Sequence, residues 1–165
     1  MCTDPNKYGD ELDQHAIVYE YADGKRLFAH GRHIPGCYNL AAVIAQGTKG
    51  RAFMPSRPHI EGEKPWRFEA PKTASSMMDN DHKALFQAVR SGTPVNNGPV
   101  MCHSTLLAIM GEMVCCTGKQ MTWEQAMKSQ LSCALPRYGW DVEPPIKPGP
   151  DGRYPAFLPG ITKLG

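Results

Sequence analysis

The sequence predicts an α+β fold, in which a mostly antiparallel open sheet carries helices packed on one face. β-Prone runs and turn signals fill residues 1–72, helix-period patterns fill 73–135, and a proline- and glycine-rich tail fills 136–165. Strands that precede helices, rather than alternate with them, are typical of this class. The 165 residues suit a single domain.

The clearest local unit is a β-hairpin within residues 13–34. Two β-prone runs flank Asp23-Gly24, a pair that favours a tight hairpin turn. Side chains alternate between the two faces of a strand: Ala16 and Val18 share one face of the first strand, and His15, Ile17, Tyr19 and Tyr21 share the other. Both faces carry apolar groups, so we expect both to be at least partly covered.

Further strands are expected in the next forty residues. The run 40–46 ends at the glycine-rich turn 47–50, and residues 51–54 form a returning strand. Short pieces at 59–60 and 66–68 add edges, with prolines between them.

Three helices are expected after the strands. In the first, His82, Leu85, Phe86 and Val89 recur at helical spacing. Asp79 or Asn80 can cap its start, and Gly92 can end it.

The second helix, 99–117, is apolar nearly all round and should be buried, with Gly118 ending it. The capping box that Thr122 forms with Gln125 opens a third, short helix to about Ser129. The tail from Pro136 is too apolar for a free linker, so we expect it to lie along the domain surface.

Composition excludes several classes of function. The net charge of +2 gives no field that would attract nucleic acid. We expect no membrane contact, because no apolar run looks long enough to cross a bilayer. The six cysteines fit no zinc spacing, so we expect no metal and read those at 102, 115 and 116 as buried thiols in a reducing compartment. The N-terminus is no signal peptide, so a cytoplasmic location is expected, although a preceding segment could carry an export signal.

The order of several short motifs resembles a known family. These are, in sequence order: EYADG, RHIPGCYN, QGTKG, DHKALFQAVRSGTPVNNG, STLLAIMGEM, TGKQMTW and LPGITKL. Together, from about Tyr8 to Leu164, they resemble the C-terminal domain of Gfo/Idh/MocA-type oxidoreductases, in the bacterial subgroup with a proline-rich C-terminus.

The resemblance implies a two-domain parent enzyme. Its N-terminal Rossmann domain would bind NAD or NADP, and its C-terminal domain would complete the substrate cleft and form the oligomer interface. This sequence contains no glycine-rich dinucleotide turn, so we expect residues 1–165 to be the C-terminal domain alone, with no bound cofactor. The family's Asp/His catalytic pair would lie before residue 1.

The segment Gly62–Trp66, GEKPW, contains the tripeptide in which the family's catalytic lysine lies. In the family, that tripeptide lies at the end of the Rossmann domain. Here it follows the QGTKG turn inside the sheet domain, so Lys64 does not match by position and reads as a residue of a solvated loop. We therefore expect no catalytic residue in the chain.

Polar residues of the hairpin are the candidate substrate contacts: Arg32, His33 and His15. Arg32 matches an arginine of the subgroup and could bond sugar hydroxyls or a carboxylate, although a structural salt bridge or an exposed strand position is the stronger reading. His33 stands where the subgroup has glutamine, and no carboxylate pairs with it in the sequence.

Other polar residues have structural readings. We interpret His82 as a packed, hydrogen-bonded core or interface group, and His103 as a satisfied core histidine rather than a metal ligand. Asn96 and Asn97 suit a turn that caps the second helix.

The expected function is that of the substrate-side and oligomerisation domain of an NAD(P)-dependent oxidoreductase that acts on a sugar or polyol-like substrate. Its expected partners are the Rossmann domain, the small-molecule substrate and a second copy that binds through the sheet. The alternative is a non-catalytic binding or assembly module.

Overall fold

The computed structural model describes residues 4, 7, 9–54, 57–70, 76–132 and 134–163. The chain divides into two compact units. The first joins Met1–Pro35 with Asn97–Gly165, and the second is Gly36–Asn96. Each unit is described by itself.

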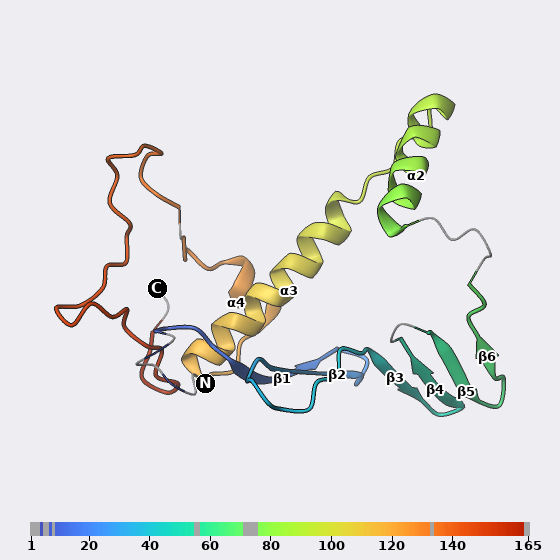
Figure 1. Cartoon of the computed structure of the whole chain (residues 1–165), viewed down its shortest axis with the longest axis horizontal. Coiled ribbons are helices and arrows are strands. Elements are labelled where there is room, and N and C mark those ends of the chain that lie inside the picture. The colour runs from blue at the N-terminus through green and yellow to red at the C-terminus, as the bar shows by residue number, and fades with distance from the viewer. Residues whose placement is uncertain are drawn as a thin grey trace. The chain divides into compact units, whose positions relative to one another are not determined.

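The first unit contains the predicted hairpin, which the structure confirms (Figure 1). Strand β1, Gln14–Glu20, pairs antiparallel with β2, Arg26–Arg32. Gly24 takes the left-handed conformation, with φ of 82°, that the turn requires. The Asp23 carboxylate accepts the N–H of Lys25 at 3.1 Å, which closes the turn locally.

Two helices complete this unit: α3, Gly98–Thr117, and α4, Trp123–Met127. Gly118 ends α3 in the left-handed conformation and donates its N–H to the Val114 carbonyl at 2.8 Å, as predicted. The capping box at Thr122 is also confirmed: its hydroxyl accepts the Gln125 N–H, while the Gln125 side chain accepts the Thr122 N–H.

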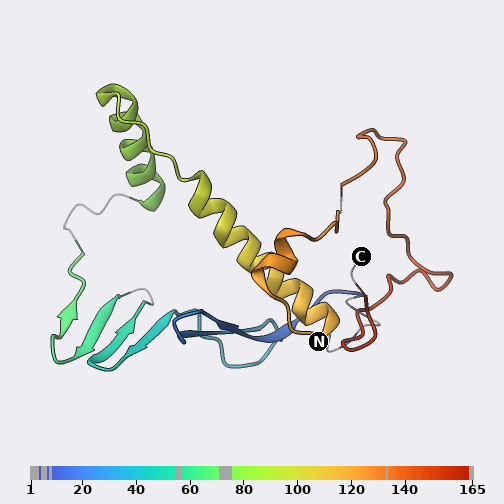
Figure 2. The same ribbon diagram turned by 180° about the vertical axis from the view of Figure 1, so that it is seen from behind.

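Helix α3 packs against β1 through its C-terminal half (Figure 2). The Tyr19 hydroxyl donates to the Leu107 carbonyl at 3.0 Å. Gly111 faces the strand, and a Cβ there would lie 2.9 Å from Ile17 Cδ1 and would also meet the Tyr19 hydroxyl. The missing side chain therefore lets the strand approach the helix closely.

The expectation that all of α3 is buried is wrong. Met110, Met113 and Cys116 are buried in its C-terminal half, whereas Val100 and Met101 near its start are 70% and 62% exposed. The reason is that the hairpin reaches the helix only around Leu107 and Gly111.

An apolar run long enough to cross a bilayer does exist, contrary to expectation. By length and composition, with a mean hydropathy of 1.5, α3 would suffice. This is weak support for a membrane span, because the core helix of a soluble protein passes the same test.

The tail lies against the domain only near its end. The Gly160 N–H donates to the Thr117 carbonyl at 2.7 Å, and Pro159 contacts the end of α3 beside Gly118. Before this point the chain forms a wide loop in both views (Figures 1 and 2), and Tyr138 and Trp140 are exposed on it. Trp140 therefore does not cover the hairpin.

The second unit contains a four-stranded antiparallel meander in the order β3-β4-β5-β6. The strands are as follows: β3 Ile44–Gly47, β4 Gly50–Phe53, β5 His59–Gly62 and β6 Trp66–Arg67. They lie where β-prone runs were predicted, and the turn at 47–50 joins the first two.

Helix α2, Met77–Ser91, also belongs to the second unit. Its N-cap is Ser76, not Asp79 or Asn80 as predicted. Asp79 is instead the third helical residue, and its carboxylate accepts a hydrogen bond from the Ser76 N–H at 3.2 Å, which completes a capping box. Gly92 ends the helix in the left-handed conformation, as predicted.

The α+β class is confirmed, since the described residues form two antiparallel sheets and three helices. Helix α3 contacts β1, whereas α2 shows no contact with any strand in the described ranges. The predicted packing of helices on one sheet face is thus seen for α3 only.

Candidate functional site

The first unit contains a groove of about 1140 Å³ beside the hairpin. We call it the hairpin groove. Residues of four segments line it: Ala16–Ala22 with Arg26 and Phe28 from the hairpin, Leu107, Met110 and Val114 from α3, the loop Gly118–Thr122, and Trp123 with Glu124 from α4.

Aromatic rings and a few charges give the hairpin groove its chemistry. Tyr19 of the hairpin and Trp123 of α4, both half-buried, line the groove. The Glu20 carboxylate and the Arg26 guanidinium form an exposed ion pair at 2.8 Å on the hairpin side. An apolar, aromatic lining with a few polar groups is typical of ligand-binding pockets.

The Tyr19 hydroxyl, which lines the hairpin groove, is already engaged in a hydrogen bond of the fold. Burial raises the pKa of the Tyr19 hydroxyl above its ordinary value, and that hydroxyl is engaged by the Leu107 carbonyl. The groove can therefore bind a ligand, while its lining contains no pairing of a nucleophile with a base.

The predicted substrate contacts do not gather at the groove. His15 pairs across the hairpin with Gly31, and Arg32 pairs with Gln14, so His15 and Arg32 lie on opposite faces. His33 follows β2 and donates its N–H to the Asp13 carbonyl at 2.7 Å. All three side chains are exposed, and none lines the hairpin groove.

His15 has a visible structural contact. Its imidazole lies against Gly31, where an added Cβ would overlap the ring. An aromatic ring that lies over a glycine on the neighbouring strand shields the glycine backbone from water, and this contact stabilises the pairing of the two strands.

His82 and His103, for which packed positions were expected, differ from expectation in burial. His103 is satisfied, because its Nδ1 lies 2.7 Å from the Pro99 carbonyl and its ring stacks on Trp123 at 5.5 Å. It is nevertheless exposed rather than in the core, since the start of α3 projects beyond the hairpin contact. His82 is likewise exposed on α2. Asn97 occupies the N-cap position of α3, although its side chain makes no capping bond.

The cysteine expectation is confirmed in part. Cys116 is buried, and burial raises the pKa of its thiol to about 11, so it stays protonated at neutral pH. Cys102, by contrast, is exposed, because it lies on the uncovered start of α3. The described ranges contain no cluster of His, Cys, Asp and Glu that could hold a metal ion.

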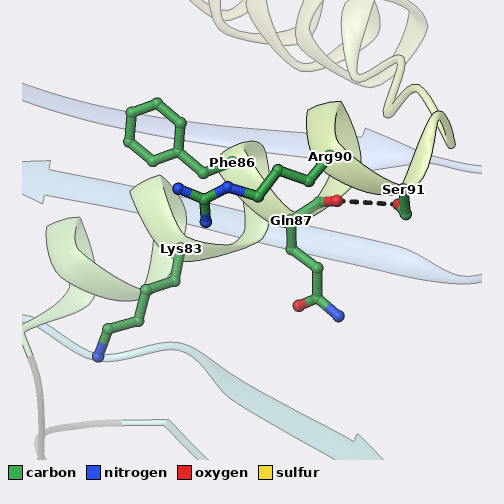
Figure 3. Close-up of a pocket in the computed structure, with 5 residues that line it drawn as sticks. All are labelled: Lys83, Phe86, Gln87, Arg90 and Ser91. Atoms are coloured by element: carbon green, nitrogen blue, oxygen red, sulfur yellow. Dashed lines mark hydrogen bonds between the residues drawn. The ribbon is translucent and has the colours of Figure 1, made fainter.

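A second, shallower hollow of about 560 Å³ lies on α2 (Figure 3). Lys83, Phe86, Gln87, Arg90 and Ser91 line it, and the Arg90 guanidinium lies 5.8 Å from the centre of the Phe86 ring. Because a single helix supplies every lining side chain, this hollow cannot surround a ligand.

Lys64 lies exposed in the turn between β5 and β6. Lys64→Ala should therefore change the free energy of unfolding by no more than about 0.5 kcal/mol, as expected of surface substitutions. Urea unfolding of both proteins would measure it. Turnover in a complete parent enzyme should also be unchanged, and a loss of orders of magnitude with folding intact would restore a catalytic Lys64.

The N-terminus of α2 carries an acidic side chain. Helix α2 follows β6 along the chain. There the capping box places the Asp79 carboxylate at the helix N-terminus, where it would repel a phosphate.

Comparison of the chain with protein-family models, with curated proteins and with solved structures found no match. The hairpin groove was not foreseen from the sequence. Its two sides, around residues 20 and 120, are about a hundred positions apart, and no local pattern brings them together.

Proposed function

We propose that this chain is the substrate-side and oligomerisation domain of an NAD(P)-dependent oxidoreductase that acts on a sugar or polyol-like substrate. The observation that carries the proposal is the shared order of seven short motifs from about Tyr8 to Leu164. The α+β class of the described residues is consistent with it. The chain by itself would not catalyse hydride transfer, because the residues that bind NAD and move the proton would belong to the Rossmann domain.

A second candidate is a non-catalytic binding or assembly module. The exposed apolar side chains favour it: Val18 and Phe28 are 53% and 58% exposed on the hairpin, and the hairpin groove beside them is open to a ligand. The two candidates differ in the gene sequence before residue 1. A Rossmann segment with its own Glu-Lys-Pro supports the oxidoreductase, and a gene without one supports the module.

Calorimetric titration with NAD and with NADP tests the proposal that this chain is a domain without a cofactor-binding site. The 165-residue chain should release no binding heat, since no glycine-rich turn is present to hold a pyrophosphate. Micromolar binding of either dinucleotide would contradict this.

A further inference from the structure

The sheet of the second unit has one face that is entirely apolar. The strand register places Ala45, Ala52, Ile60 and Trp66 in one row, and Phe68 continues it two residues beyond Trp66. We call these five residues the apolar sheet face. Ile60, Trp66 and Phe68 are each 40–50% exposed.

The opposite face of the same sheet is mostly polar. Arg51, His59, Glu61 and Arg67 lie there around Phe53, whose ring stacks on His59 at 4.8 Å. Such alternation is typical of an antiparallel sheet that is covered on one side and solvated on the other. The apolar sheet face is therefore the side that requires a cover.

Helix α2 carries a matching apolar stripe. Met78, Leu85, Phe86 and Val89 project from one side at helical spacing, with the exposed His82 among them, and all four apolar side chains are more than half exposed. Lys83, Gln87 and Arg90 lie toward the other side. Caps at both ends of α2 satisfy its terminal backbone groups. The further stability of the helix must come from packing of its apolar stripe against another element.

We propose that α2 docks this stripe on the apolar sheet face of its own chain. Both elements belong to the same unit. The nine-residue step from Phe68 to Met77 can span up to ~30 Å, more than the ~14 Å width of four paired strands. The apolar sheet face contains no charged side chain, so docking would bury no unpaired charge on the sheet side.

The docking of α2 on the apolar sheet face does not depend on the proposed oxidoreductase role. It would also limit the surfaces through which a second copy of the chain could bind. With the apolar sheet face occupied by α2, exposed apolar side chains such as Val18 and Phe28 of the hairpin remain available to a second copy.

The docking can be tested by measuring amide hydrogen exchange in two variants of the full chain, Leu85→Lys and Gln87→Lys. Both side chains are exposed on the isolated helix and both changes add one positive charge, but only Leu85 belongs to the stripe. Leu85→Lys should speed exchange of the β5 amides about tenfold or more, while Gln87→Lys leaves them unchanged. Equal exchange in the two variants would overturn the proposal.

The sheet side supplies a reciprocal test with the adjacent pair Ile60→Lys and Glu61→Lys, which lie on opposite faces of β5. Only Ile60→Lys should speed exchange in α2. If Ile60→Lys disrupts the sheet itself, the helix variants still decide, because Leu85 lies outside the strands and its substitution leaves their hydrogen-bonded pairing intact. Protection of β5 that rises with protein concentration would show that a second copy provides the cover, and would overturn docking within one chain.

Discussion

Gly111→Ala is expected to lower the free energy of unfolding by about 1–3 kcal/mol, the usual cost of an extra methyl group in a packed contact. The new Cβ would lie 2.9 Å from Ile17 Cδ1 and against the Tyr19 hydroxyl. To make room, Tyr19 must move away from the Leu107 carbonyl and lose its hydrogen bond. Urea unfolding followed by circular dichroism would measure the difference.

The sign of this result is informative, because alanine is the better helix former by about 1 kcal/mol. An uncrowded Gly111 would therefore give a stabilised variant, which would contradict the close packing of β1 on α3. Repeating the change in a Tyr19→Phe background separates the lost hydrogen bond from the steric cost. Non-additive effects are expected, since the two residues are in contact.

Self-association through the hairpin is the second large effect. We expect the chain to form dimers at micromolar concentration, because Val18 and Phe28 pair across the hairpin and are both more than half exposed. Phe28→Glu should weaken the dimer roughly thirtyfold or more, as ~2 kcal/mol does at an interface centre. Light scattering over a concentration series would measure it.

Tyr138→Glu is the matched control, since Tyr138 is an exposed aromatic residue of the tail. It should leave the dimer unchanged. Tyr19→Glu is unsuitable, because Tyr19 bonds α3 and its loss would disturb folding. A monomeric unmodified chain at all concentrations would rule out the interface.

Local signals predicted much of the secondary structure. Asp23-Gly24, Gly92, Gly118 and the Thr122 capping box each specify a turn or a helix end within a few residues, and each was found in place. The N-cap of α2 was misplaced by three residues, because a serine and an aspartate three apart both suit a helix start.

The candidate site was far less predictable. The sequence drew attention to His15, Arg32 and His33, which are polar and close together along the chain. Strand alternation instead places His15 and Arg32 on opposite faces. The hairpin groove depends on Trp123 and the loop after α3 meeting the hairpin from across the unit, and such long-range contacts leave no periodic trace in the sequence.

The sequence by itself thus determined the class of fold, the hairpin, the approximate strand positions and the glycine-capped C-terminal ends of α2 and α3. Tertiary structure decided which hairpin face meets α3 and which part of α3 is buried. Alternation of side chains defines two faces of a strand but does not show which face packs against a helix. A helix that is apolar all round likewise does not show which of its sides is buried. The choice came from shape: Gly111 leaves the space on α3 into which Ile17 and Tyr19 fit.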